Sequence, residues 1–262
     1  MSPRQSPATL SPPAFLQLAG HPLRWRLLGE LARSDRSVHE LTGLVGEPQN
    51  LVSYHLGKLR SANLVLARDS SADRRDTYYI PNLALIGRLL STVGGALHPG
   101  LRLSPPAPDS TPIIPARVLF LCTGNSARSQ MAESLCRVLS GGAIEAYSAG
   151  SFPKPLQANA IRVMWETHGL DLKGQESKHL QVFAGQTFDW VISLCDRVRE
   201  VCPVFSGQPE VIHWSIPNPA TTEPDAVTYP QFQQTAAELS TRITFLLAEL
   251  RRRAAPTEEE QA

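Results

Sequence analysis

The chain has 262 residues, of which 42% are hydrophobic and 19% charged, and its formal net charge is +1. This length fits one large domain or two small ones, and the apolar content excludes a wholly disordered chain. No apolar run approaches the roughly 20 residues of a membrane helix, and the first residues lack the apolar core of a signal peptide. Four cysteines are too few for a disulfide scaffold, so we expect a cytoplasmic protein without membrane association.

Charge, cysteine and proline content divide the chain into two halves. Residues 1–110 contain 12 Lys and Arg against 8 Asp and Glu, a balance of +4, whereas residues 111–262 contain 13 against 16, a balance of −3, and all four cysteines. Six prolines among the 17 residues from 99 to 115 predict a linker, because proline fixes φ and removes a backbone donor. We therefore expect a domain over residues 12–98, a linker over 99–115, a second domain over 116–253 and a disordered tail over 254–262.

The first half is predicted to be mainly helical with one hairpin. Apolar residues at helical spacing predict helices over residues 23–31, 38–44, 49–60 and 82–97. Two strand-like runs, at 64–68 and 77–80, flank the polar segment 69–73 and predict a β-hairpin.

The third predicted helix presents side chains suited to DNA. Gln and Asn can read adenine edges, Ser can pair with either base, and Lys neutralises phosphate. Beside the hairpin tip, Arg74 and Arg75 would contact the DNA backbone or the minor groove. The alternative is a small helical domain whose polar stripe is merely solvated. The candidate DNA-binding residues on the helix are Gln49, Asn50, Ser53, Tyr54 and Lys58.

The segment GEPQNLVSYHLGKLRSANLV, followed by ARDSSADRRDTYYI, resembles the ArsR-type winged-helix repressors over residues 12–98. The resemblance implies a winged helix–turn–helix that regulates transcription from a double-stranded DNA operator, and a homodimer formed through this domain. Many members sense metalloids through a Cys-x-Cys pair, where this chain has Ser37 and His39. We therefore expect no metal site here and an ordinary role for His39, so the inducing signal must enter another way.

The second half alternates strands and helices, which predicts a parallel sheet covered by helices on both faces. Strands are predicted over residues 118–121, 144–148, 190–194 and 211–214. The helix after the first strand is expected to bury one face, consisting of Met131, Leu135, Val138 and Leu139. The last helix carries an apolar stripe of Phe232, Ala236, Leu239, Ile243, Leu246 and Leu250.

A cysteine and an arginine enclose a five-residue loop between the first strand and its helix, in Cys122-Thr-Gly-Asn-Ser-Ala-Arg128. Such a loop turns backbone N–H groups inward, and with the helix dipole it can bind a tetrahedral oxyanion. The same field favours a nucleophilic thiolate at Cys122, and Arg128 can hold two anion oxygens. The other candidate oxyanion-binding residues are Thr123, Gly124, Asn125 (which can hold the loop's shape), Ser126, Ala127 and Ser129 (which can donate to the thiolate).

This motif and topology resemble the low-molecular-weight protein tyrosine phosphatases, and the thioredoxin-coupled arsenate reductases of the same fold, over residues 116–253. The resemblance implies a four-stranded parallel sheet. Cys195 and Cys202, seven residues apart after a strand, match the reductases' further cysteines. It implies that Cys122 attacks arsenate, that Cys195 attacks Cys122 to expel arsenite, and that Cys202 attacks Cys195 to form a redox-active disulfide. No bound cofactor is implied, only an external reductant, thioredoxin or a low-molecular-weight thiol. Cys136 is expected in the core.

Asn218 stands where both relatives place a general-acid aspartate before a proline. An amide cannot exchange a proton in that role, so we expect poor phosphatase activity and slower reduction; Asp225 is the one nearby substitute. The favoured interpretation is an arsenate reductase fused to a transcriptional regulator, in arsenical resistance. One alternative is a low-molecular-weight protein tyrosine phosphatase fused to a regulator. Another is a repressor whose second domain senses thiol oxidation or oxyanions with little catalysis.

Overall fold

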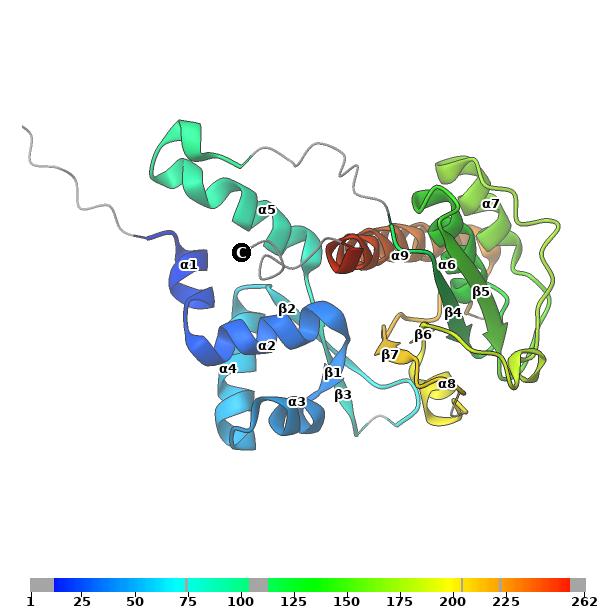
Figure 1. Cartoon of the computed structure of the whole chain (residues 1–262), viewed down its shortest axis with the longest axis horizontal. Coiled ribbons are helices and arrows are strands. Elements are labelled where there is room, and N and C mark those ends of the chain that lie inside the picture. The colour runs from blue at the N-terminus through cyan, green and yellow to red at the C-terminus, as the bar shows by residue number, and fades with distance from the viewer. Residues whose placement is uncertain (1–11, 74, 104–112, 204, 222, 255–262) are drawn as a thin grey trace, which may run out of the picture. The chain divides into compact units, whose positions relative to one another are not determined.

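The computed structural model describes residues 12–73, 75–103, 113–203, 205–221 and 223–254 (Figure 1). Arg74, most of the expected linker and almost all of the expected tail lie outside these residues. The chain forms two compact units. The first comprises Met1–Ala32, Val38–Leu66 and Pro81–Asp109; the second comprises Arg33–Ser37, Ala67–Ile80 and Ser110–Ala262. The second unit therefore includes two segments of the N-terminal half as well as the whole region after the linker.

The first unit is helical, as its sequence predicts. A core of leucines and other apolar side chains, including Leu27, Leu41 and Leu56, is fully buried between the helices. The last helix starts after Asn82, whose side chain accepts a hydrogen bond from the backbone N–H of Leu85, and ends before two glycines rather than at residue 97. The helices are α1 (Ala14–Ala19), α2 (Pro22–Arg33), α3 (Val38–Val45), α4 (Gln49–Ser61) and α5 (Leu83–Val93), followed by 3₁₀ turns at Gly94–Ala96 and Pro99–Leu101.

A small sheet contains the predicted hairpin. Its order is β1-β3-β2, with β1 at Arg36–Ser37, β2 at Val65–Asp69 and β3 at Thr77–Pro81. The strand β1 pairs antiparallel with β3, placing Arg36 opposite Tyr79. With only two residues, β1 has no periodicity from which it could be predicted.

The main sheet of the second unit is parallel throughout and has the order β5-β4-β6-β7. The central strand β4 is the most apolar, and the residues from Val118 to Leu121 have no exposed surface. The predicted fold class is confirmed. The strands are β4 (Ala116–Cys122), β5 (Ile144–Gly150), β6 (Trp190–Ser193) and β7 (Glu210–His213).

Among the described residues, the α-helices that accompany this sheet are α6 (Arg128–Leu139), α7 (Ala158–His168), α8 (Asp196–Glu200) and α9 (Asp225–Ala254). The long helix α9 packs against α6 and α7, and its predicted apolar stripe is buried. The predicted buried face of α6 is partly wrong. Val138 and Leu139 are exposed because α6 turns Ala132 and Cys136 inward instead. None of the described helices combines the length and apolar character that crossing a bilayer requires.

Candidate functional site

The loop from Cys122 to Arg128 joins the end of the central strand to the start of α6. Three of its carbonyl oxygens, at positions 123, 124 and 126, accept hydrogen bonds of 2.8–2.9 Å from backbone N–H groups in the segment 152–157. Because N–H and C=O point in opposite directions across a trans peptide, the N–H groups that follow these carbonyls face the other side of the loop. The loop and the N-terminus of α6 therefore have the polarity of an anion site.

Asn125 shapes this loop from behind. It is fully buried in the left-handed region at φ 44°, which asparagine tolerates better than most residues. Its amide donates to the hydroxyls of Ser129, at 2.9 Å, and Ser148, at 2.8 Å. Gly150 lies against the same loop, and a Cβ there would come within 2.6 Å of the Thr123 carbonyl oxygen. Glycine is therefore required at this end of β5.

The sulfur of Cys122 lies 2.9 Å from the hydroxyl oxygen of Ser129. Either atom can be the donor in this contact, and Ser129 also accepts a hydrogen bond from Asn125. Hydrogen bonds to the charged form favour that form. The Ser129 hydroxyl is therefore placed to donate to the Cys122 sulfur when that sulfur is a thiolate. Neither Asn125 nor Ser129 lines the pocket at Cys122.

A pocket of about 470 Å³ opens above Cys122. Three cationic side chains line it, from Arg128, Lys154 and Arg197, and no described Asp or Glu does. One guanidinium nitrogen of Arg128 donates to backbone carbonyls of the flanking segments, Ile216 at 2.8 Å and Leu194 at 3.3 Å. These bonds hold the arginine at the pocket wall. The predicted loop residues Thr123, Gly124, Ser126 and Ala127 also line the pocket.

The structure brings two of the three predicted relay cysteines together. Cys122 and Cys195 line the same pocket, and the sulfur of Cys195 lies 3.3 Å from the hydroxyl of Thr123. Cys195 precedes α8, whereas Cys202 follows that helix, is not among the pocket-lining residues, and has its pKa raised by burial. Cys136 is buried in the core, and this burial raises its pKa to about 12.

Asn218 lines the pocket; its assignment to the general-acid position stays a prediction. Its side-chain amide donates to the backbone carbonyl of Ala220. Asp225 begins α9 and is not among the residues that line the pocket, so no carboxylate of the described residues lines the pocket in place of Asn218.

Ser71, Lys154 and Arg197 are among the pocket residues that the sequence did not indicate. Each comes from a different segment: the tip of the β2–β3 hairpin, the loop after β5, and α8. No spacing pattern links these segments, so no sequence signal could have grouped them.

The candidate DNA-reading face of α4 has the predicted polarity. Its buried side carries Val52, Leu56 and Leu59, while the opposite side is exposed. The Lys58 ammonium lies 5.4 Å from the centre of the Tyr54 ring. The exposed residues of this face are Gln49, Asn50, Ser53, Tyr54 and Lys58.

Of the two arginines predicted to contact DNA from the hairpin tip, Arg75 is among the described residues. The guanidinium of Arg75 is exposed and donates to the carboxylate of Asp73 at 2.6–3.1 Å. His39 is an exposed residue near the start of α3. Among the described residues, no group of three or more His, Cys, Asp or Glu side chains could hold a metal ion.

Comparison with known proteins assigns both halves. The family model described as low molecular weight phosphotyrosine protein phosphatase matches residues 117–255, and that of the bacterial regulatory protein, arsR family, matches residues 21–66. A Brevibacillus brevis protein named arsenate reductase is 35% identical over 126 residues, which are 48% of this chain and 90% of that protein. A Halalkalibacterium halodurans protein of the same name is 35% identical over 127 residues, 48% of this chain and 91% of that protein.

A solved structure described as an arsenate reductase in oxidized state has 29% sequence identity, covers 52% of this chain and 98% of its own, and has a TM-score of 0.46. The sequence matches span the sheet, the Cys122 loop and the α8 region as one continuous domain. The chain therefore belongs to the low molecular weight phosphotyrosine protein phosphatase family, and it carries an ArsR-family helix–turn–helix ahead of that domain.

Proposed function

We propose that the chain reduces arsenate to arsenite through Cys122, Cys195 and Cys202, and that its helix–turn–helix binds operator DNA as a transcriptional regulator of arsenical resistance. The observation that supports this most is the meeting of Cys122 and Cys195 in one cationic pocket. A phosphatase needs only the first of these thiols, whereas a reductase needs the second to receive the oxidation.

In the first step the oxyanion binds among the loop N–H groups and Arg128, with Lys154 and Arg197 adding positive charge. The Cys122 thiolate attacks arsenic and forms an arsenic–sulfur bond, while one arsenic oxygen leaves as water. Ser129, 2.9 Å from the sulfur, stabilises the attacking thiolate.

In the second step the Cys195 thiolate attacks the sulfur of Cys122. A disulfide forms, and the electron pair of the arsenic–sulfur bond stays on arsenic, which leaves as arsenite. Cys202 then attacks the sulfur of Cys195 and expels the Cys122 thiolate. An external thiol reductant, thioredoxin or a low-molecular-weight thiol, returns two electrons to the Cys195–Cys202 disulfide, so no bound cofactor is needed.

Asn218 bears differently on the two candidate reactions. An aryl phosphate must leave as a phenolate that takes a proton from the enzyme, and an asparagine cannot supply one. An arsenate oxygen can leave as water with protons that the anion already carries. The residues around this pocket therefore favour arsenate reduction over phosphomonoester hydrolysis.

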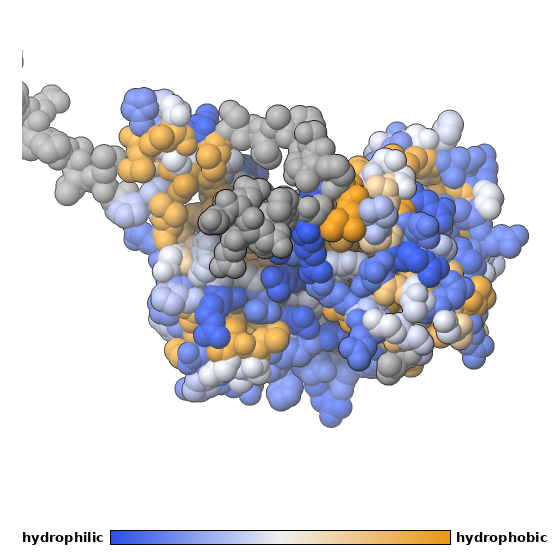
Figure 2. All heavy atoms as spheres, viewed as in Figure 1, coloured by the Kyte–Doolittle hydropathy of each residue, from blue (hydrophilic) through white to orange (hydrophobic). Residues whose placement is uncertain are grey.

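The first unit also carries an exposed apolar surface that fits a second copy of this chain. Leu97, Leu101 and Leu103 are each more than half exposed, and Figure 2 shows hydrophobic atoms gathered at this end of the unit, over α5 and the turns after it. Apolar surface of this kind is commonly covered by association. We therefore propose that two copies of the chain form a homodimer through this unit.

The test is arsenate-dependent NADPH oxidation with thioredoxin and its reductase, repeated with a low-molecular-weight thiol system. Cys195→Ser and Cys202→Ser should each lose at least about 100-fold in turnover, whereas the matched core variant Cys136→Ser should retain it. Cys202→Ser should still release one arsenite per chain and accumulate a Cys122–Cys195 disulfide. Absence of arsenate turnover with every reductant would overturn the catalytic proposal and favour the sensing alternative.

The same variants distinguish the proposed reductase from the alternative, a phosphatase. A phosphatase would hydrolyse p-nitrophenyl phosphate efficiently and would be indifferent to Cys195→Ser. The proposal expects weak hydrolysis by the native chain, because Asn218 occupies the acid position in the pocket.

A further inference from the structure

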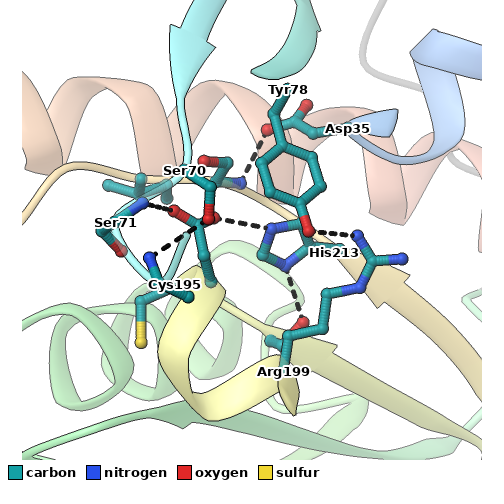
Figure 3. Close-up of polar contacts among 12 residues, drawn as sticks. Asp35, Ser70, Ser71, Tyr78, Cys195, Arg199 and His213 are labelled. Carbon is teal, nitrogen blue, oxygen red and sulfur yellow. Dashed lines mark hydrogen bonds and ion pairs between the residues drawn. The ribbon is translucent and has the colours of Figure 1, made fainter. Parts of the chain in front are cut away.

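The tip of the β2–β3 hairpin lies on α8, the short helix between the second and third relay cysteines (Figure 3). The backbone N–H of Ser71 donates to the carboxylate of Asp196 at 2.7 Å, and the carbonyl oxygen of Ser71 accepts from Arg197 at 3.2 Å. Farther along both elements, the hydroxyl of Tyr78 accepts from Arg199 at 3.0 Å. The hairpin thus holds α8 at both ends.

Asp196 is the centre of this contact. It is buried, and on its other side His213 lies 3.0 Å away through Nε2. Burial alone would raise the pKa of Asp196, but the hydrogen bonds from His213, Ser71 and Ser215 hold it well below its usual value. The Tyr78 ring packs on His213, with ring centres 4.8 Å apart. The hairpin therefore completes the environment of a buried carboxylate on α8.

A second anchor fixes the strand beside the hairpin. The carboxylate of Asp35, immediately before β1, accepts from the backbone N–H of Ser215 at 2.7 Å. The hydroxyl of Ser34 bonds to the backbone of His213, with the N–H at 3.0 Å and the carbonyl at 3.2 Å. Since β1 pairs with β3, the hairpin is attached to the second unit through its strand as well as its tip.

The relay chemistry conflicts with the helical form of α8. Cys195 precedes the helix and Cys202 follows it, seven residues on; at about 1.5 Å per residue this places their Cα atoms about 10 Å apart. A disulfide requires roughly 4.4–6.8 Å. The Cys195–Cys202 disulfide can therefore form only if α8 unwinds, and unwinding displaces Arg197 and Arg199 from their partners on the hairpin.

We propose that the hairpin, in its described residues 69–73 and 75–78, is docked on α8 while Cys195 and Cys202 are thiols and is released when they are joined in a disulfide. The oxidising equivalents come from arsenate: Cys202 attacks the Cys122–Cys195 disulfide, Cys122 leaves as a thiolate, and both electrons have already passed to arsenic. This inference rests on the proposed function for its natural oxidant. It gives the regulator a route by which arsenate chemistry reaches the hairpin, although the N-terminal half contains no cysteine.

Linkage makes the coupling reciprocal. If the disulfide weakens hairpin docking, a weaker docking contact must favour the disulfide by the same factor. Both directions can be measured in the full-length chain.

The first experiment oxidises the full-length Cys122→Ser chain with diamide and follows amide hydrogen exchange in peptides covering residues 67–80. Mass spectrometry verifies the Cys195–Cys202 disulfide. The hairpin amides, Ser71 included, should exchange about tenfold faster after oxidation, because two or three hydrogen bonds to α8 are lost. The control, Cys122→Ser with Cys202→Ser, cannot form the disulfide and should show no change. A disulfide that leaves exchange unchanged, or thiols that do not pair at all, would overturn the proposal.

The second experiment measures the thiol–disulfide equilibrium of Cys195 and Cys202 in glutathione buffers. Tyr78→Phe, which keeps the ring but removes the hydroxyl that accepts from Arg199, should shift the equilibrium about threefold or more toward the disulfide. Arg162→Ala, which removes an exposed paired arginine on α7, should not. Equal behaviour of the two variants would also overturn the proposal.

Neither experiment uses arsenate, so the two proposals fail separately. Hairpin release on chemical oxidation without arsenate turnover would remove the reductase and keep the coupling. Arsenate turnover with an unaltered hairpin would keep the reductase and remove the coupling.

Discussion

Arg242 on α9 and Asp35 before β1 form a two-pronged ion pair, with nitrogen–oxygen distances of 3.0 and 3.1 Å, although they lie 207 positions apart in the chain. Both side chains are buried. Burial would lower the pKa of Arg242, but Asp35 and Glu238 raise it above its usual value. This pair attaches residues 33–37 to helix α9. Because β1 pairs with β3, it also anchors the hairpin within the second unit.

Asp35→Asn should destabilise the second unit by about 3–5 kcal/mol, because removing one partner leaves a buried guanidinium without its main counter-charge. The measurement is urea unfolding of the native chain and the variant. Glu249→Gln, which breaks a more exposed pair with Arg252, should cost less than about 1 kcal/mol. Similar losses in the two variants would contradict the structural role given to Asp35.

The Asp196 contact predicts a pH dependence with a definite sign. Its folded pKa is depressed, so the stability it contributes is fully present above the unfolded value of about 4. That contribution is lost as the pH falls through the lower, folded pKa. Asp196→Asn should therefore lower the unfolding free energy by about 1–3 kcal/mol at pH 7 and by progressively less below pH 4. A difference that stays constant down to pH 2 would be inconsistent with a charged Asp196.

Thiol reactivity should follow position in the fold. With a pKa raised to about 12 by burial, Cys136 remains a neutral thiol at pH 8, and only the thiolate reacts readily. In the native chain, iodoacetamide should modify Cys136 at least about 100-fold more slowly than Cys122. Peptide mass mapping over time measures this. In guanidinium chloride all four cysteines should react at similar rates, and fast native labelling of Cys136 would refute its placement.

Restoring a carboxylate at the pocket should reveal the phosphatase chemistry that the asparagine suppresses. Asn218→Asp should raise the kcat for p-nitrophenyl phosphate by about 100-fold or more, the usual contribution of a positioned general acid. The gain should be lost above the pKa of the new acid. Asn218→Ala is the matched control and should resemble the native chain. No gain in Asn218→Asp would show that the side chain does not reach the leaving group.

The candidate DNA-reading face of α4 allows two separable predictions. Asn50→Ala should relax sequence preference at one base pair and cost about 1–3 kcal/mol on the operator. Lys58→Ala should weaken binding evenly across sequences and reduce the salt slope by about one. Fluorescence anisotropy over a salt series distinguishes them. Equal effects on operator and unrelated DNA from both variants would mean that Asn50 reads no base.

Local patterns were sufficient for much of this molecule. The apolar run before Cys122 and the alternation after it predict the parallel sheet, because strands buried on both faces must be continuously apolar. The chemistry of the Cys-x5-Arg loop could be predicted from local sequence, since its residues are adjacent in the chain and need only a strand and a helix to position them. The polar face of α4 is likewise readable from helical spacing.

The sequence did not predict the contacts between segments that are far apart in the chain, because no periodicity connects such segments. Ser71 and Asp196 are 125 positions apart, and Asp35 and Arg242 are 207 apart. In the sequence, Ser71 lies in an ordinary polar turn, and nothing distinguishes Asp35 from the acidic residues that are exposed on the surface. Only the packing of β1, the hairpin tip, α8 and α9 buries Asp35 and Asp196 and supplies their hydrogen-bond partners. The sequence by itself predicted the chemistry of the loop from Cys122 to Arg128, whereas the tertiary structure decided that the hairpin belongs to the second unit, because burial and pairing arise only when distant segments meet.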